Sequence, residues 1–599
     1  MKKICSAFLL LNLAVSAVYC QDKKIVILHT NDMHSRLNGF APESAYSPLT
    51  VNDDKTIGGF SRIATVIKSE KQKKDQVTLV IDAGDFLMGT LFHTVEERTG
   101  FQLPLMRKMG YDLVAVGNHE FDFGPSVLYN ILKNSSENGE IPVMMLGNAI
   151  YSKTDRADDG LESLTGKGIL CRTVIKEEDG VRIGFFSLLG RNAVFVSPNA
   201  KPVTFKDQEK FAGEAVKELR SKRCSLIICI SHSGVSKGEN GTWEGEDAEL
   251  VKKVGGIDLL ISGHTHTKLD KPLVVNGVPV VQAGEYGEFV GKITLRKNNG
   301  AYSLESYELI PVDDHIAGDR IVDSLIKAQQ EKISGLVLKK VRLEYSEPLA
   351  ECSEMLECNG QVNPEESTLG PLLADAIHWY LNARSAAGDD VSMISTGVIR
   401  DKMLPGVQSA ADLFRIVPLG SGKDSVPGYP LARLYVTGRE LKNILEVLLV
   451  ARKSNPDYYC YFSGIRAEYN PDKGLLRKVK RIEIIKDGDR SEAVDFSKKN
   501  KKLYSVAANS YMLEFIGIIR KKTHGIVNVV PKDINGARVT DMSKAVVDID
   551  EKAAGIQEGK EWLALVGYLG QMKDLNGNGL PDLDPKYYKP VKSLFVVKK

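Results

Sequence analysis

Histidine, aspartate and asparagine recur in short polar clusters along the first half of the chain. The clusters read "NDMH", "AGD", "GNHEFD", "SHSG" and "GHTH". Seven side chains in them are candidate metal ligands: Asp32, His34, Asp85, Asn118, His232, His264 and His266. A mixed nitrogen and oxygen set without thiolate suits Zn²⁺, Mn²⁺, Co²⁺ or Fe²⁺. Two ions would need about seven or eight ligands, with one carboxylate shared between them.

Each cluster alone has an ordinary structural explanation. Asp32 with His34, taken alone, reads first as a capping aspartate beside a surface histidine, and Asp85 as a helix cap after a strand. His232 alone reads as a satisfied polar residue. The set is more telling, because five of the ten histidines follow predicted strands, namely His34, His119, His232, His264 and His266.

Seven apolar, β-branched runs precede these clusters and predict the elements that position them. Continuous apolar runs of this length are typical of strands buried on both faces. They cover 24–34, 77–85, 111–122, 182–192, 225–234, 257–266 and 278–287, each including its polar end. Helical patterns between them, such as 60–74 and 208–223, indicate a layered α/β domain. Ligands gather at the carboxyl ends of strands in such domains, so we expect the clusters at one edge of one sheet.

The alternation of strands and helices fades near residue 315. Residues 318–341 predict one helix that runs into a linker, and a mixture of helical and strand-like runs follows. We therefore expect a catalytic domain over 24–317, a linker over 318–345 and a second domain over 346–599.

The order of the clusters carries a resemblance to a known family. D-x-H, G-D, G-N-H-E, H and G-H-T-H resemble the calcineurin-like metallophosphoesterases, and "ILHTNDMHSRL" resembles their secreted 5′-nucleotidase branch, which includes bacterial UDP-sugar hydrolases. The resemblance is strong over about 24–300 and looser over 340–560. It implies a four-layer αββα sandwich, a helical linker and an α+β substrate-binding domain.

The resemblance also implies roles for the site residues. One ion would be bound by Asp32, His34, Asp85 and His266. The other would be bound by Asp85, Asn118, His232 and His264, with Asp85 bridging. A hydroxide between the ions would attack the phosphorus. His119 would stabilise the phosphoryl group or protonate the leaving oxygen, oriented by Asp122.

The second domain departs from the family pattern. Where the family has Asn-Gly-Gly-Gly-Ile-Arg, this chain has "STGVIR", which keeps Arg400 for phosphate and places Ser395 at the substrate-binding asparagine. Arg400 in a structural ion pair is the alternative. Leu419 replaces one base-stacking aromatic residue. In the region of the second, Asn509 remains and Tyr511 or Phe515 could supply a ring.

Composition and the N-terminal residues indicate the class of protein and its location. The 599 residues are 43% hydrophobic and 26% charged, as in ordinary globular proteins. The net charge is +2, and removal of residues 1–20, with Lys2 and Lys3, would leave a neutral chain. A neutral chain argues against bulk capture of nucleic acid or anionic membrane. Residues 1–20 predict a signal peptide, with a buried N-terminal helix as the alternative. A lipid on Cys20 would be the one attachment to a membrane, although Tyr19 is bulky for it.

Two smaller features leave alternatives open. Cys352 and Cys358 are close enough in sequence to bridge, whereas Cys224 and Cys229 lie in a strand-like run and predict core thiols. The segment 574–584 has the front half of a calcium loop but lacks the closing glutamate, so a calcium ion and a plain Asx-rich turn are both compatible with it.

The sequence thus predicts an exported dinuclear-metal phosphohydrolase that acts on nucleoside 5′-monophosphates and serves nucleotide breakdown in the periplasm or at the cell surface. A nucleotide-sugar or 2′,3′-cyclic nucleotide hydrolase is the enzymatic alternative. A non-catalytic surface binding protein on the same scaffold is the alternative of another class. The sequence does not fix the oligomeric state.

Overall fold

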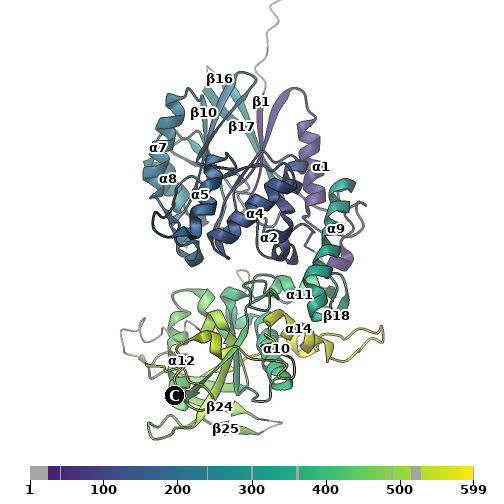
Figure 1. Cartoon of the computed structure of the whole chain (residues 1–599), viewed down its shortest axis with the longest axis vertical. Coiled ribbons are helices and arrows are strands. Elements are labelled where there is room, and N and C mark those ends of the chain that lie inside the picture. Colours follow the sequence, from purple (N-terminus) through teal and green to yellow (C-terminus); the bar gives the residue numbers. More distant parts are fainter. Residues whose placement is uncertain are drawn as a thin grey trace, which may run out of the picture.

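The computed structural model describes residues 24–597, except 41, 239, 299–300, 359–362, 475, 487–489 and 514–527. The predicted signal peptide and Cys20 therefore lie outside the described residues. Two lobes lie one above the other along the longest axis, with the N-terminal half in the upper lobe and the C-terminal half in the lower one (Figure 1).

The upper lobe contains two sheets that pack face to face. One sheet has the strand order β17 (Ala301–Pro311), β16 (Phe289–Asn298), β1 (Lys24–Thr30), β2 (Gln76–Asp82), β3 (Leu113–Ala115), β4 (Val143–Met145) and β6 (Leu170–Cys171). The other has the order β14 (Leu273–Val275), β15 (Val278–Val281), β13 (Leu259–Ser262), β10 (Leu226–His232), β8 (Val181–Leu189) and β7 (Thr173–Glu178).

The apolar strands alternate between two cores, which is why they read as continuous hydrophobic runs. In β1, Ile25 and Ile27 enter the core between the two sheets, while Val26 and Leu28 enter the core under the outer helices. Both faces of the strand are therefore buried, as a four-layer sandwich requires.

Helices cover the outer face of each sheet (Figure 1). On the first sheet they are α1 (Phe60–Lys71), α2 (Glu96–Thr99), α3 (Gln102–Met109), α4 (Pro125–Asn138) and α5 (Asp159–Gly166). On the second they are α7 (Gln208–Ser221) and α8 (Glu246–Lys253). The layers confirm the predicted αββα sandwich, and α1 and α7 lie where the helical patterns were found.

The helix α9 (Arg320–Leu336) leads from the upper lobe towards the lower one and packs on α1. A short 3₁₀ turn, η6 (Leu338–Val341), follows it. The helix predicted over 318–341 is thus present, with its last turn tightened into a separate element.

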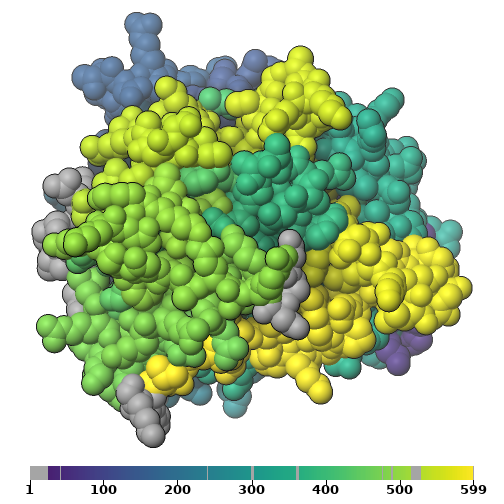
Figure 2. Space-filling model, turned by 90° about the horizontal axis from the view of Figure 1, so that it is seen from below, coloured from purple at the N-terminus to yellow at the C-terminus, as the bar shows by residue number. Residues whose placement is uncertain are grey.

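The lower lobe mixes sheets and helices. One sheet has the order β21 (Leu431–Thr437), β26 (Leu503–Asn509), β19 (Val391–Ser395) and β22 (Cys460–Ser463), and another β25 (Ser491–Ala493), β24 (Val479–Ile485), β23 (Ile465–Tyr469) and β27 (Leu594–Val596). A two-stranded sheet pairs β18 (Pro348–Cys352) with β20 (Gly406–Ser409). The helices include α10 (Leu369–Arg384), α11 (Ala410–Ile416), α12 (Gly438–Ala451) and α14 (Glu561–Gly570). Seen from below, this lobe fills most of the view (Figure 2).

Buried ion pairs join the two lobes. The Arg36 guanidinium lies 2.7 Å from the Asp401 carboxylate, which in turn lies 3.0 Å from Arg415. The backbone N–H of Glu43 donates to the Asp412 carboxylate over 3.1 Å. These contacts fix the lobes in an arrangement that brings the chain near Arg400 up to the edge of the N-terminal sheets.

The cysteines of the described residues are free thiols. Cys224 and Cys229 are buried, as expected for core residues. Cys352 and Cys358 are also unbridged, and the Cys358 thiol donates to the Tyr461 hydroxyl. No helix among the described residues combines the length and apolar character needed to cross a lipid bilayer.

Candidate dinuclear metal centre

The seven candidate ligands meet at the carboxyl ends of strands from both sheets. Asp32 and His34 follow β1, Asp85 follows β2 and Asn118 follows β3, all in the first sheet. His232 ends β10, and His264 and His266 follow β13, both in the second sheet. The expectation of one edge of one sheet was therefore wrong, because the two sheets stack with their carboxyl edges together and each supplies part of the site.

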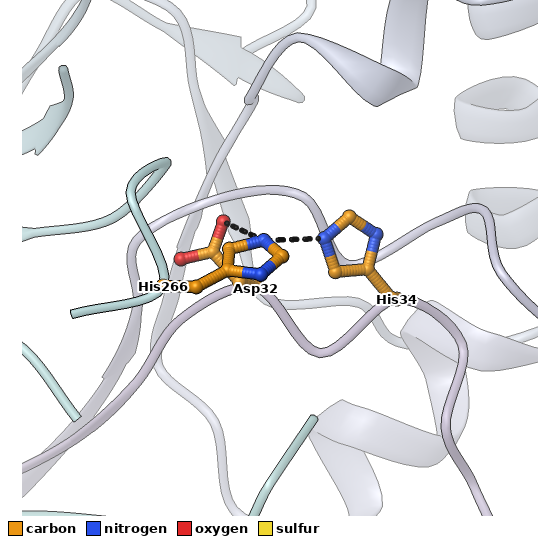
Figure 3. A group of neighbouring side chains, drawn as sticks. All are labelled: Asp32, His34 and His266. Carbon is orange, nitrogen blue, oxygen red and sulfur yellow. Dashed lines mark hydrogen bonds and ion pairs between the residues drawn. The ribbon is translucent and has the colours of Figure 1, made fainter. Parts of the chain in front are cut away.

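Asp32, His34 and His266 form the first group of donors (Figure 3). The Nε2 atoms of His34 and His266 lie 3.1 Å apart, and His266 Nε2 lies 3.6 Å from Asp32 Oδ1. The Asp32 and His34 side chains are buried and His266 is half-buried. Three lone-pair donors thus converge on one small volume, with little room for water to solvate them separately.

Asp85, His232 and His264 form the second group, and Asn118 joins it. His232 Nε2 lies 3.0 Å from Asp85 Oδ2. The side-chain oxygen of Asn118 lies 2.8 Å from His264 Nδ1 and 3.2 Å from His232 Nε2. Asp85 also groups with His34 and His119 within metal-binding distance, so this carboxylate stands between the two groups.

The backbone around these ligands is held in an unusual conformation. Asp32, His34, Asp85, His264 and His266 all have a positive φ, between 48° and 79°. Such a conformation costs roughly 1–3 kcal/mol for a residue other than glycine and is concentrated at functional sites. Gly84 fits closely here, because a Cβ on it would lie 2.9 Å from the Nδ1 atom of His232.

The charges of the site influence one another strongly. Burial lowers the pKa of His264 to about 3, and the neighbouring His232 adds to this effect. Burial also lowers the pKa of His232, but the Asp85 carboxylate outweighs burial and raises that pKa to about 10. The group therefore concentrates negative charge on Asp85, and this carboxylate favours a cation beside it.

His119 lies beside the donors and is held by a carboxylate. Its Nδ1 atom lies 2.7 Å from Asp122 Oδ2, and its backbone N–H donates to Asp85 over 2.8 Å. The rings of His119 and His34 are in edge contact at 5.2 Å. With Nδ1 engaged by Asp122, Nε2 is the ring nitrogen on the other side, away from that carboxylate.

The donor set fits divalent ions. It supplies imidazole nitrogens, carboxylates and one amide oxygen, and it contains no thiolate, which matches Zn²⁺, Mn²⁺, Co²⁺ or Fe²⁺. Nitrogen donors about 2.0–2.1 Å from a tetrahedral ion lie roughly 3–3.5 Å apart, and the two Nε2 atoms of the first group already stand at that separation.

Residues of the second domain reach the donors, but not all of those predicted. Arg400 and Leu419 line a small cavity together with His34 and Tyr286. Ser395 ends β19, and Asn509 is fully buried with its amide donating to Glu561 over 2.9 Å. Neither lines that cavity.

The predicted aromatic replacements lie in two different situations. Tyr511 stacks on Tyr429, with ring centroids 5.3 Å apart and an angle of 11° between the planes. Tyr429 is tied to Leu419 by a backbone hydrogen bond of 2.9 Å, so the pair lies next to the cavity wall. Phe515 lies outside the described residues.

Several residues of the site were not singled out in the sequence. Glu285 forms an ion pair with His266 Nδ1, and Asn192 Oδ1 lies 2.9 Å from His264 Nε2. The hydroxyl of Tyr286 donates to the Arg400 carbonyl over 3.3 Å. Asn192 follows β8 and Glu285 follows β15, so the strand-end criterion that found the ligands also applied to "LLGRN" and "QAGEYG".

The segment 574–584 has an acidic neighbour that is distant in sequence. The Asp574 carboxylate accepts from the N–H groups of Gly577 and Gly579, as in an Asx-rich turn. Glu351 of β18 accepts from the amides of Asn576 and Asn578 over 3.1 and 2.6 Å. A carboxylate therefore stands near the turn, although it comes from another part of the chain.

Comparisons with known proteins agree with this geometry. Residues 25–268 match the model of the calcineurin-like phosphoesterases, and residues 351–516 match that of the 5′-nucleotidase C-terminal domain. The sandwich and its strand-end donors thus define a metallophosphoesterase. The second match narrows the class further, and the chain belongs to the 5′-nucleotidase family of metal-dependent phosphoesterases.

Curated relatives are about 25% identical to this chain over the matched residues. "Protein 5NUC" of Lutzomyia longipalpis is 26% identical over 531 residues, which cover 82% of this chain and 84% of that protein. The 5′-nucleotidase of Bos taurus is 25% identical and covers 77% of this chain and 78% of its own length. "Trifunctional nucleotide phosphoesterase protein YfkN" of Bacillus subtilis is 25% identical, and the match spans 32% of that longer protein.

Solved structures show the same fold. The 5′-nucleotidase precursor of Thermus thermophilus has a TM-score of 0.66 at 21% identity and covers 96% of this chain and 100% of its own. The "Putative 5′-Nucleotidase" of Staphylococcus aureus has a TM-score of 0.57 at 18% identity and covers 96% of this chain and 100% of its own. At these identities the likeness concerns the fold alone.

Proposed function

We propose that the chain is an exported phosphohydrolase that releases phosphate from nucleoside 5′-monophosphates. The observation that carries the proposal is the meeting of two donor groups on the shared Asp85, beside a cavity that His34 and Arg400 line together. Export rests on the predicted signal peptide over 1–20, with a lipid on Cys20 as its membrane-anchored variant. Kinship with 5′-nucleotidases of other organisms supports the nucleotide.

The donors divide between two divalent ions. Asp32, His34 and His266 would bind one, and Asn118, His232 and His264 the other, with Asp85 between them. When bound, such a pair lowers the pKa of water and withdraws charge from a phosphoryl oxygen.

His119 and Asp122 would act on the reacting phosphate. Asp122 holds Nδ1 of the ring, which leaves Nε2 to donate a hydrogen bond to a phosphoryl oxygen or a proton to the leaving oxygen. The edge contact with His34 keeps the ring beside the donors. The pair therefore holds a proton where an ester oxygen leaves.

Arg400 would bind the phosphate from the opposite lobe. It lines the cavity that His34 also lines, and a guanidinium can give an oxyanion two parallel hydrogen bonds. Tyr286 holds the Arg400 carbonyl, so the position of the side chain depends on contact between the two lobes. This supports a division of labour between a catalytic domain over 24–317 and a substrate domain over 346–599, joined by the linker 318–345.

The nucleobase would meet the chain next to Leu419. The stacked Tyr429 and Tyr511 rings supply a flat aromatic surface there, and Tyr511 is 38% exposed. Base–aromatic stacking is worth about 1–3 kcal/mol per base. Ser395 and Phe515 would be further substrate-binding residues, whereas the buried Asn509 would act indirectly, by shaping the end of β26 through its bond to Glu561.

A calcium ion in the segment 574–584 is a separate proposal. Asp574, Asn576, Asn578 and Asp582 carry oxygen side chains, and the Glu351 carboxylate lies beside the amides of Asn576 and Asn578. Thermal melting with and without Ca²⁺ tests it. We expect Ca²⁺ to raise the Tm of the unsubstituted protein and not that of Glu351→Gln. Equal Tm values with and without Ca²⁺ would indicate a plain turn that binds no calcium.

Phosphate release from a panel of substrates tests the function. The Mn²⁺- or Zn²⁺-loaded protein should hydrolyse AMP and UMP faster than glycerol phosphate, and Tyr511→Ala should narrow that difference more than Tyr511→Phe. Faster turnover of a nucleotide sugar or a 2′,3′-cyclic nucleotide would reassign the substrate. If a protein loaded with both ions turned over no member of the panel, a non-catalytic binding protein would be the better description.

A further inference from the structure

His264 and His266 each make contacts through both ring nitrogens. The partner on the side away from the donors is charged for His266 and neutral for His264. His266 presents Nε2 to His34 and Asp32, and its Nδ1 forms an ion pair with Glu285. His264 presents Nδ1 to Asn118, and its Nε2 lies 2.9 Å from Asn192 Oδ1. The two rings thus face the donors through opposite nitrogens.

The opposite nitrogens require opposite tautomers. A ring nitrogen that faces an ion must be unprotonated, so the hydrogen of a neutral imidazole resides on the other nitrogen. In His266 that hydrogen points to the Glu285 carboxylate, and in His264 it points to the Asn192 carbonyl oxygen. Each outer partner therefore selects the tautomer that turns a lone pair towards the donor group.

The two partners differ in charge, and this difference has a consequence. A carboxylate that accepts from an imidazole raises the basicity of the ring, whereas a neutral amide fixes the orientation with a smaller effect on basicity. Glu285 belongs to the segment after β15, and Asn192 to the short helix α6 (Arg191–Phe195) after β8. The two outer partners thus come from separate strand ends and can be changed independently.

We propose that Glu285 and Asn192 are positioning residues for the two ions, Glu285 through His266 and Asn192 through His264. The inference rests on the proposed ligand division. It goes beyond that division because it predicts that each outer partner governs the affinity of one ion and leaves the other unchanged. Loss of an outer partner typically lowers metal affinity by about 10- to 100-fold.

Calorimetric titration of the metal-free full-length protein with Mn²⁺ tests the proposal without using activity. Glu285→Gln, which keeps size and removes charge, should raise one of the two dissociation constants by about 10- to 100-fold. Asn192→Ala should raise the other by a smaller factor. The variant Asn192→Asp introduces a negative charge like that of Glu285. It should therefore restore or increase the affinity for the ion whose binding Asn192→Ala weakens.

A matched control lies on the same segment as Glu285. Glu288→Gln removes a carboxylate three residues away and should leave both dissociation constants within about twofold of the unsubstituted protein, far below an outer-partner effect. Circular dichroism and Tm of each metal-free variant show whether folding is intact. The visible spectrum of the Co²⁺-loaded protein should change with Glu285→Gln and not with Glu288→Gln.

Two results would overturn the proposal. One is a Glu285→Gln protein with both constants unchanged, and the other is an equal loss at both ions in a protein that still folds. Failure of the proposed function looks different, because the unsubstituted protein would then bind two ions and release no phosphate from the panel. An unsubstituted protein that binds fewer than two ions would contradict the ligand division itself.

Discussion

The Nε2 atoms of His34 and His266 face each other across 3.1 Å. Burial lowers the pKa of His34 well below its usual range, and the neighbouring His266 lowers it further, which favours the neutral form of the His34 ring. The pair can share one hydrogen bond, or both lone pairs can face one cation. Asp32 Oδ1 lies 3.6 Å from the same His266 nitrogen and adds a negative charge, which favours the cation.

Removal of a ligand should reduce metal binding without unfolding the domain. His266→Ala should lower the affinity of one ion by more than about 100-fold, because removing only the hydrogen-bond partner of a ligand already lowers it by up to about that factor. Phosphate release should fall at least as much. Metal content after dialysis and far-ultraviolet circular dichroism check this. Loss of helical signal together with metal would instead indicate a structural role. The matched variant is His378→Ala, which changes a half-buried histidine of α10 that belongs to no group of metal donors among the described residues.

Removal of His119 should separate catalysis from metal binding. His119→Ala should slow turnover on the order of 10²–10⁴-fold, the range for a general acid or base. Both ions should remain bound, because His119 stands beside the donors and is held by Asp122. Turnover and metal content measured on one preparation decide the matter. A variant that loses both ions would make His119 a ligand.

Arg400 should act on substrate binding more than on metal binding. A hydrogen bond to a charged group contributes about 1.5–3 kcal/mol, so Arg400→Ala should weaken substrate binding by roughly 10- to 150-fold. Arg400→Lys should recover part of the loss, since it keeps the charge and loses the two-pronged geometry. An unchanged KM for AMP in Arg400→Ala would assign the residue to a structural ion pair.

The contact between the lobes should weaken as the pH rises towards 7. Burial raises the pKa of Glu43 to about 7, and the Asp412 carboxylate contributes, against the lowering effect of Arg415. The folded protein therefore retains this proton while the unfolded chain, which titrates near about 4.3, has lost it. The stabilisation is complete below about 4.3 and lost as the pH rises through about 7.

Thermal melting of Glu43→Gln checks this expectation. The side chain accepts from Asn38 over 2.6 Å, and the Tyr345 hydroxyl donates to it over 3.3 Å, so glutamine keeps much of the network. The difference in Tm between pH 5 and pH 8 should shrink in the variant. An identical pH dependence in both proteins would show that other groups set it.

Much of the site followed from residue types at strand ends. The positions of Asp32, Asp85, His232 and His264 required only that apolar runs be strands and that ligands gather at their carboxyl ends. The strand patterns carried this information because each strand is buried on both faces, as Ile25 and Val26 illustrate by entering different cores.

The remainder depended on contacts between distant parts of the chain. Ile25 and Val26 read alike as buried residues, so the apolar runs did not separate one sheet from two. Glu285 approaches His266 only after the loops following β13 and β15 fold together. Tyr429 precedes β21 and Tyr511 follows β26, so their stacking joins segments far apart in the sequence and no local pattern predicts it.

The dinuclear centre is tested most directly by anomalous diffraction from crystals of the Mn²⁺-loaded protein. Two manganese peaks should appear about 3.5–4 Å apart, one beside His34 and His266 and the other beside His232 and His264, with the Asp85 carboxylate between them. A single peak, or peaks that leave Asp85 uncoordinated, would contradict a centre built on this shared carboxylate.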